Sequence, residues 1–303
     1  MSSSKKFQEL DLSNAFLFAA ALEDEETCQL VLDIILGKSI GKVKVKAERT
    51  ILYNSDFRCV RFDIYANSEQ GAEINLEMQN ENEGNLAKRS RYHQAQLDMN
   101  SLKPGQDFND LQPSYVIFIC AFDPFGYKRY QYTFEKRCLE ESFFPLGDET
   151  RVIFFNTKGE NDDKVPAVLI HFLHYVENST DSYVVQVHDD EIQKLHDKIK
   201  TLKQSRRLVA QYMQFEEMLR KRERDGRAEG RAEGRAEGRT EGETLKVIKL
   251  IKHKLQKNLD AKTIAEHLEE PEEFVARVCN VIAENPDAQA EEIIEQMKPI
   301  VIK

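Results

Sequence analysis

The chain has 303 residues, of which 41% are hydrophobic and 32% charged, enough for one large core and a small additional module. Its 43 Lys and Arg residues against 53 Asp and Glu residues give a net charge of -10, which argues against a surface coated with DNA-binding charge but leaves room for a local basic strip. Five scattered cysteines without a CxxC pair exclude a disulfide framework or a structural zinc site and favour a reducing cytoplasm. The N-terminal residues lead into no apolar signal core, and the longest apolar run, residues 115–122, is too short to span a bilayer.

The first part of the chain predicts a helix followed by strands. Residues 13–36 carry apolar side chains at helical spacing and end at Gly37, which predicts one helix. Residues 42–52 alternate between polar and apolar and suggest a strand or an extended arm. Two further alternating runs, 58–66 and 72–79, flank a segment rich in turn-forming residues and predict a β-hairpin.

The middle of the chain predicts a central sheet flanked by helices. A polar helix over residues 84–102 ends at a Lys-Pro-Gly sequence, and the apolar, β-rich run 114–122 indicates a strand buried on both faces. Further strands are expected over 130–135 and 151–156, and further helices over 165–178 and 189–219. Strand, crossover helix and buried strand together predict a mixed α/β domain.

A low-complexity tract follows this domain. Glycine recurs at every fourth residue from Gly226 to Gly242, with Arg-Ala-Glu or Arg-Thr-Glu between. Two interpretations remain open: a flexible linker, or a glycine-striped helix that forms when another chain packs on the stripe. Residues 243–303 return to helical patterning. We therefore divide the chain into a domain of residues 1–222, a repeat of residues 223–242 and a small helical module of residues 243–303, with a homo-oligomer formed through the repeat and the module as one expectation.

A pair of carboxylates is the first candidate for chemistry. Glu77 and Gln79 share the polar face of the second hairpin strand, and folding the hairpin near Gln70 brings Asp63 next to Glu77. Two carboxylates beside an amide can bind a hard cation such as Mg²⁺, which activates water and stabilises charge on a phosphate. Since like charges repel, replacing either carboxylate by alanine is expected to leave stability unchanged or slightly higher.

The helix that follows the hairpin carries a cluster of cations. Lys88, Arg89 and Arg91, with Tyr92 beside them, begin a few residues after the carboxylates. Such a cluster can bring a phosphodiester backbone to a metal site. A solvated charged helix face is the alternative interpretation.

These residues resemble a known family. The likeness extends over roughly residues 10–220 as ordered blocks, and it is to the bacterial recombination-promoting nuclease and transposase family of the PD-(D/E)XK nuclease superfamily. The blocks are residues 60–65 (VRFDIY), 75–80 (NLEMQN), 88–92 (KRSRY), 113–120 (PSYVIFIC), 122–126 (FDPFG) and 155–159 (FNTKG).

The resemblance implies a restriction-endonuclease-like core and a metal-dependent DNA endonuclease. Asp63 and Glu77 would be the metal ligands for Mg²⁺ or another divalent cation. Gln79 stands where the superfamily usually has lysine; an amide can orient a water but cannot accept its proton, so the general base is undefined. Lys88, Arg89, Arg91 and Tyr92 would contact DNA.

Two other functions stay open. Gln79, together with Ala15 where some relatives have Asp, motivates a non-enzymatic DNA-binding or assembly protein on a degenerate nuclease fold. A structural adapter built on the C-terminal repeat is the third hypothesis. His171 and His174, spaced for metal binding on an apolar helix, and Cys120 within the buried strand are expected to be structural.

Overall fold

The structure is a computed structural model that describes residues 6–37, 41–47, 50–51, 60–61, 64–141 and 144–297, without the side chains of residues 46, 47, 50, 51, 60 and 61. The chain divides into two compact units, Met1–Gln214 and Phe215–Lys303. The first contains the sheet, and the second is helical.

A mixed six-stranded sheet forms the centre of the first unit, with the strand order β1-β4-β5-β6-β8-β7. The central pairs β5–β6 and β6–β8 are parallel, whereas β1–β4, β4–β5 and β7–β8 are antiparallel. The strands are β1 (Val43–Ala47), β4 (Ile64–Ser68), β5 (Glu73–Gln79), β6 (Ser114–Cys120), β7 (Gln131–Phe134) and β8 (Thr150–Asn156), beside a separate pair of β2 (Thr50–Ile51) and β3 (Val60–Arg61).

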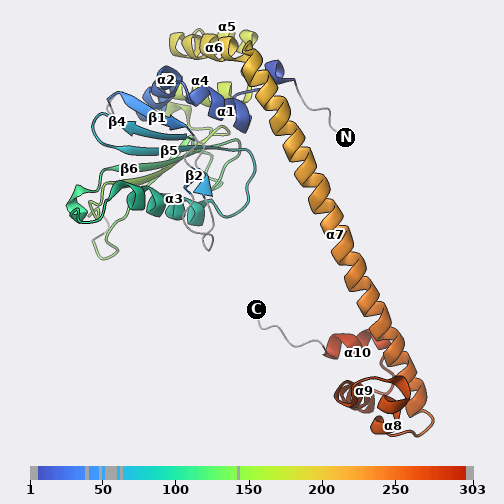
Figure 1. Cartoon of the computed structure of the whole chain (residues 1–303). Coiled ribbons are helices and arrows are strands. Elements are labelled where there is room, and N and C mark those ends of the chain that lie inside the picture. Colours follow the sequence, from blue (N-terminus) through green and yellow to red (C-terminus); the bar gives the residue numbers. More distant parts are fainter. Residues whose placement is uncertain are drawn as a thin grey trace. The chain divides into compact units, whose positions relative to one another are not determined.

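Helices cover both faces of this sheet (Figure 1). On one face the main core packs aliphatic side chains of the sheet against η1 (Phe7–Glu9), α1 (Ala15–Leu22), α2 (Glu25–Leu36), α4 (Ala167–Glu177), α5 (Asp181–Val187) and α6 (Asp190–Lys203). On the other face α3 (Leu86–Ser101) lies over β5 and β6, above a smaller core that includes Val116, Phe118 and Phe154. The short helices η3 (Phe108–Asp110) and η4 (Asp162–Lys164) lie in connections. The predicted fold class, a restriction-endonuclease-like mixed sheet between helices, is confirmed.

The predicted hairpin is formed by β4 and β5. Ile64 pairs with Leu76 and Ala66 with Ile74, so the described register centres on residue 70, as the sequence predicts. Gly71 in the turn has φ +89°, a backbone conformation that favours glycine, and a Cβ there would also require the Gln112 side chain to move.

Two of the predicted helices are interrupted. Residues 13–36 form α1 and α2 rather than one helix, because the Asp24 carboxylate accepts a hydrogen bond from the backbone N–H of Thr27 and caps a new helix. Similarly, 189–219 contains the end of α6 at Lys203 and the start of α7 (Arg206–Leu255). Helix α5 has no counterpart among the predicted elements. The other helices and strands predicted over residues 84–178 are confirmed within a few residues.

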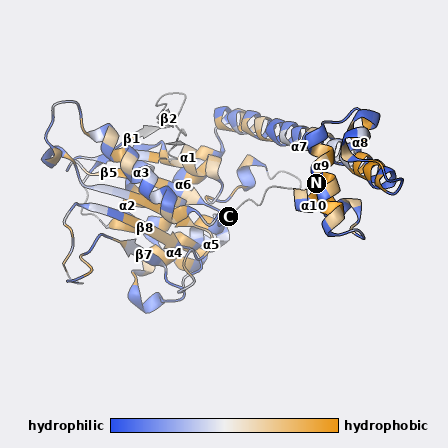
Figure 2. Cartoon of the chain, turned by 90° about the horizontal axis from the view of Figure 1, so that it is seen from below, coloured by the Kyte–Doolittle hydropathy of each residue, from blue (hydrophilic) through white to orange (hydrophobic). Residues whose placement is uncertain are grey.

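The second unit contains most of α7, followed by α8 (Ala261–Leu268), α9 (Glu272–Glu284) and α10 (Ala290–Met297). The glycine tract is helical and exposed, and Figure 2 shows the middle of α7 as mainly hydrophilic. Ion pairs join Glu223 to Arg227 and Arg239 to Glu243 at the two ends of the tract. Ile248 and Ile251 of α7 pack with α8, α9 and α10 in a separate small core. Among the described residues, none of the helices has the length and apolar character needed to cross a membrane.

Candidate active site

A layer of polar side chains is buried between β5 and α3. The polar face of β5 carries Asn75, Glu77 and Gln79, all of them buried. On the helix side Ser90, His93 and Gln94 are buried as well, and His93 contacts Glu77. The polar face is therefore an interface within the protein and not part of its outer surface.

The inward face of α3 explains why the helix covers these polar groups. Leu86, Ser90, His93 and Leu97 follow one another at steps of four, three and four residues and therefore share one side of the helix. Leu86 and Leu97 pack into the smaller core at the two ends of this side. The polar residues between them are thereby held against β5.

Glu77 is the centre of the layer, and its side chain is 0% exposed. Its Oε2 lies 2.7 Å from Nη2 of Arg89, whose side chain is 31% exposed. Its Oε1 lies 2.7 Å from Nδ1 of His93, which is buried. A buried carboxylate requires such partners, because an isolated charge is very costly to remove from water.

The neighbouring amides complete the network. Nδ2 of Asn75 lies 3.4 Å from Oε1 of Glu77, and Nε2 of Gln79 lies 3.4 Å from Oε2. Arg89 Nη1 donates to Oε1 of Gln79 over 3.1 Å. Nδ1 of His93 also lies 3.0 Å from Oδ1 of Asn75. Since its two close neighbours are a carboxylate oxygen and an amide oxygen, both acceptors, Nδ1 must carry a hydrogen.

An aromatic side chain from β6 lies beside the network on the same face of the sheet. Phe118 is fully buried and pairs across the parallel strands with Glu77. Its ring centroid lies 6.0 Å from the guanidinium carbon of Arg89 and 6.0 Å from the ring centroid of His93. Phe118 thus gives the guanidinium of Arg89 and the ring of His93 an apolar aromatic neighbour.

The predicted site residues are only partly brought together in the described residues. Glu77 and Gln79 lie side by side, and Arg89 joins them from α3. Lys88 and Arg91 are exposed on α3, and Tyr92 is 36% exposed. Asp63 lies outside the residues that the structure describes. Sequence reasoning missed the contacts of Asn75 and His93, although the spacing of the inward face of α3 carries a signal for His93.

The oxygens present suit a hard divalent cation. Carboxylate and amide oxygens are the ligand types that Mg²⁺ takes in proteins, and Oε2 of Glu77 and Oε1 of Gln79 are close enough for one guanidinium to contact both. Within the part of the chain that the structure describes, no group of three or more His, Cys, Asp or Glu residues could hold a metal ion. A site at Glu77 would therefore need a ligand from elsewhere, for which the sequence offers Asp63.

The histidine pair on α4 is engaged in structural contacts. His171 Nδ1 lies 2.8 Å from Oδ2 of Asp189, and His174 Nε2 lies 3.4 Å from the hydroxyl of Tyr130. Burial lowers the pKa of His174, which favours the neutral ring. Cys120 is a core thiol, and burial raises its pKa to about 12.

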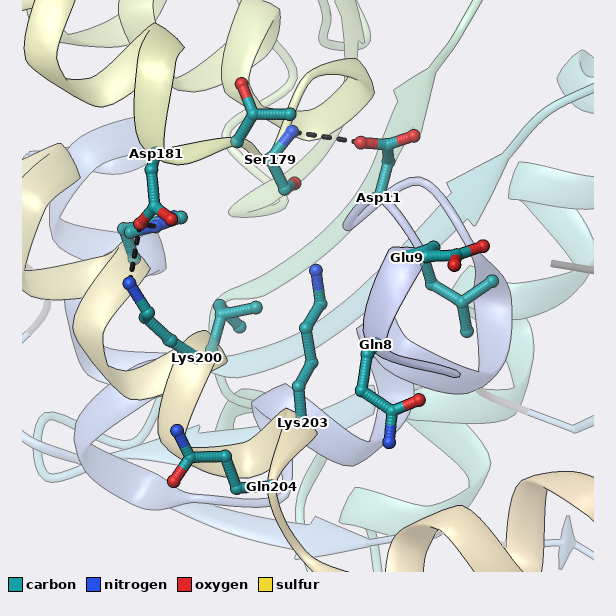
Figure 3. Close-up of a pocket in the computed structure, with 12 residues that line it drawn as sticks. Gln8, Glu9, Asp11, Ser179, Asp181, Lys200, Lys203 and Gln204 are labelled. Atoms are coloured by element: carbon teal, nitrogen blue, oxygen red, sulfur yellow. Dashed lines mark hydrogen bonds and ion pairs between the residues drawn. The ribbon is translucent and has the colours of Figure 1, made fainter. Parts of the chain in front are cut away.

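A pocket of about 400 Å³ lies where the N-terminal segment meets α5 and α6 (Figure 3). Its charged groups contact one another: Asp181 accepts hydrogen bonds from Lys200 and His196, and mainly the Lys200 bond lowers the pKa of Asp181 to about 2. The backbone N–H of Ser179 donates to Asp11. The Ser179–Asp11 bond ties the N-terminal segment to the connection between α4 and α5, and we assign the pocket no chemistry.

Comparison with known protein families identifies the family of this chain. The model of the PD-(D/E)XK nuclease family transposases matches residues 10–228, more than half of the chain. The chain belongs to this family. The match covers the whole sheet, the Glu77 network and α3, and it confirms the resemblance drawn from the sequence blocks. No curated protein and no solved structure matches the chain.

Proposed function

We propose that the protein is a metal-dependent DNA endonuclease that hydrolyses phosphodiester bonds and serves DNA recombination or mobile-element activity. The single observation that carries the proposal is the buried Glu77–Gln79–Arg89 cluster on the second strand of the hairpin, inside the region that the family model matches. A buried carboxylate paired with an arginine, in a nuclease family, is a strong candidate for a metal ligand.

Asp63 and Glu77 are the proposed ligands of Mg²⁺ or another divalent cation. Ile64 pairs with Leu76, and the next residue of β5 after Leu76 is Glu77, which supports Asp63 as the residue facing it. The bound cation would activate a water and stabilise the charge that develops on the phosphate. The Gln79 amide would orient the attacking water, but cannot accept its proton.

The outer side of α3 is the proposed DNA contact. Lys88 and Arg91 are exposed there, and Tyr92, which follows Arg91, is 36% exposed. Their charges are local in a chain whose net charge is -10, so phosphate binding would be confined to this side and not spread over the molecule. Arg89 is the fourth proposed contact, although in the structure it lies against Glu77.

One observation favours the alternative of a non-enzymatic DNA-binding protein on a degenerate nuclease fold. Both carboxylate oxygens of Glu77 already lie within hydrogen-bonding distance of donors from the protein. In that alternative the network is structural, and the protein binds DNA without cutting it.

A plasmid assay separates the two functions. Full-length protein is incubated with supercoiled plasmid and Mg²⁺, with EDTA as the metal control and circular dichroism as the folding control. We expect nicking that EDTA abolishes and that Asp63→Asn and Glu77→Gln remove while the proteins stay folded. Glu81→Ala, at an exposed acid just beyond β5, should cut like the wild type. DNA binding without any cutting by the wild type would favour the alternative, and cutting by both site variants would refute the proposed ligands.

A further inference from the structure

The guanidinium of Arg89 contacts Glu77 and Gln79, the two residues of β5 to which the proposed function gives roles. Nη2 lies 2.7 Å from Oε2 of Glu77, and Nη1 lies 3.1 Å from Oε1 of Gln79. These are an oxygen of the proposed metal ligand and the oxygen of the amide that would orient water. One side-chain cation therefore occupies positions that the proposed reaction needs for a metal ion and a water.

The oxygens of Glu77 are fully used by donors of the protein. Oε1 lies near His93 and Asn75, and Oε2 lies near Arg89 and Gln79, with no separation above 3.4 Å. A carboxylate offers about four lone-pair directions in all. A divalent cation that binds Glu77 must therefore displace one of these donors.

Burial decides which donor can leave. His93 is 2% exposed, so its ring would lose the carboxylate in a buried position with little access to water. Arg89 is 31% exposed and carries its charge on a long flexible stem, so its guanidinium can turn outward and be hydrated. Of the two donors that lie 2.7 Å from Glu77, Arg89 is the one that a metal ion can displace at the lower cost.

Resting on the proposed function, we propose that Arg89 competes with the divalent cation for Glu77 and that DNA relieves this competition. A phosphate group near α3 offers Arg89 a bidentate partner in place of the carboxylate. Once the guanidinium has turned to the phosphate, Oε2 of Glu77 and Oε1 of Gln79 can serve the metal and the water. Metal and DNA then bind with positive coupling, and by linkage each raises the affinity for the other by the same factor.

This arrangement restricts metal loading to the DNA complex. Without DNA the protein holds its own cation on the carboxylate, which keeps the buried site neutralised. With DNA bound, the exchange of Arg89 for a divalent cation assembles the site where a phosphate is present. Coupling between two ligands typically changes an affinity by about 5-fold to 150-fold, which is a measurable range.

Calorimetric titration of Ca²⁺ tests the proposal independently of cleavage. Ca²⁺ takes oxygen ligands, and it is titrated into desalted, EDTA-treated full-length protein with and without a short duplex, whose integrity is checked afterwards on a gel. The wild type should bind Ca²⁺ about 10-fold more tightly with the duplex than without it. Arg89→Ala should bind Ca²⁺ without DNA about 10-fold more tightly than the wild type does, and should lose most of the coupling. Lys103→Ala, at an exposed cation just beyond the end of α3 that has no proposed role in binding, should behave like the wild type.

A second set of variants separates this proposal from the proposed function. Arg89→Gln removes the charge but keeps a hydrogen-bond donor, and it carries the test if Arg89→Ala does not fold. If both Arg89 variants bind Ca²⁺ without DNA as the wild type does, while Glu77→Gln abolishes binding, Arg89 is no competitor but the metal site stands. If Glu77→Gln leaves Ca²⁺ binding unchanged in a folded protein, the metal site itself is refuted and the coupling with it.

Discussion

Replacing Glu77 by alanine should destabilise the protein, against the expectation from the sequence that removing one of two repelling carboxylates is harmless. The structure pairs Glu77 with Arg89 and His93 at 2.7 Å each. Removing one partner of a buried pair costs about 3–5 kcal/mol when the other stays buried. Arg89 is 31% exposed and can be hydrated, so its share of this penalty is small.

The remaining cost comes from the buried side chains around Glu77. The Nδ1 hydrogen of His93 would lose the carboxylate but keep Oδ1 of Asn75, at 3.0 Å, whereas Nε2 of Gln79 would lose Oε2 of Glu77. The loss of buried hydrogen bonds costs about 1–3 kcal/mol, and the gap left by the carboxylate adds to it. We therefore expect Glu77→Ala to lose about 2–3 kcal/mol of unfolding free energy, which for a unit of this size lowers Tm by about 5–10 °C.

Urea and thermal unfolding, followed by circular dichroism, measure this loss. Glu77→Gln should be destabilised less, because it keeps the volume and one acceptor oxygen but places an amide donor against neighbouring donors. Glu81→Ala, at an exposed acid, should stay within about 0.5 kcal/mol of the wild type. The loss should persist at high salt, since a buried pair is poorly screened. An unchanged or raised stability of Glu77→Ala would refute the reasoning and restore repulsion between carboxylates as the dominant effect.

Three further predictions concern DNA, the glutamine and the C-terminal repeat. Replacing Lys88 and Arg91 together by alanine should weaken binding to all DNA sequences and flatten the slope of log K against log salt by about 2, because two phosphate contacts are lost. Anisotropy titrations over a salt series measure this slope. An unchanged slope would place the DNA elsewhere on the protein. Gln79→Lys should remain active in the plasmid assay with altered metal or pH dependence, whereas complete inactivity of the folded variant would show that the amide's own hydrogen bonds are required. A truncation to residues 1–222 should fold and nick plasmid but lose oligomerisation and double-strand cutting. Light scattering measures the oligomeric state, and plasmid linearisation measures double-strand cutting. If the truncated protein keeps the oligomeric state of the full chain, the repeat has no role in assembly.

The hairpin and most strands of the sheet could be predicted from the sequence, because strand alternation and turn residues are local signals. The positions of Gly71 and the neighbouring turn formers set the centre of the hairpin, and with it the described register of Ile64 against Leu76. The apolar run of β6 likewise predicted burial on both faces, and the structure has it buried between the two helical layers.

The covering of the polar face could not be predicted from β5 alone. A strand with alternating polar residues has the same pattern whether water or a polar helix face lies above it. The missing information was on α3, where Ser90 and His93 lie between Leu86 and Leu97 on one side of the helix. In the sequence the cations of that helix form one cluster. In the structure they differ, because Arg89 contacts Glu77 whereas Arg91 is exposed.

The glycine tract is a different case, because the low helix propensity of its glycines opposes the helix that the structure shows. Each glycine costs a helix about 1 kcal/mol relative to alanine, and a four-residue repeat places like charges one above the other at i,i+4. Favourable pairs therefore form where the repeat ends, at Glu223–Arg227 and Arg239–Glu243. These two ion pairs stabilise the ends of the helical tract. The sequence alone did not decide between a flexible linker and a helix.

The polar layer itself is the strongest physical argument that this face of the sheet serves function. On the next strand, β6, the residues Val116, Phe118 and Cys120 fill the space under α3 with apolar side chains. On β5 the matching positions hold Asn75, Glu77 and Gln79. An apolar replacement of a buried ion pair is often neutral or stabilising, so stability alone gives no reason to keep a carboxylate there. The Arg89 and His93 contacts offset the cost of burying Glu77, and the partly exposed Arg89 is a partner that can be exchanged, so the cluster supports the proposed metal site over a purely structural role.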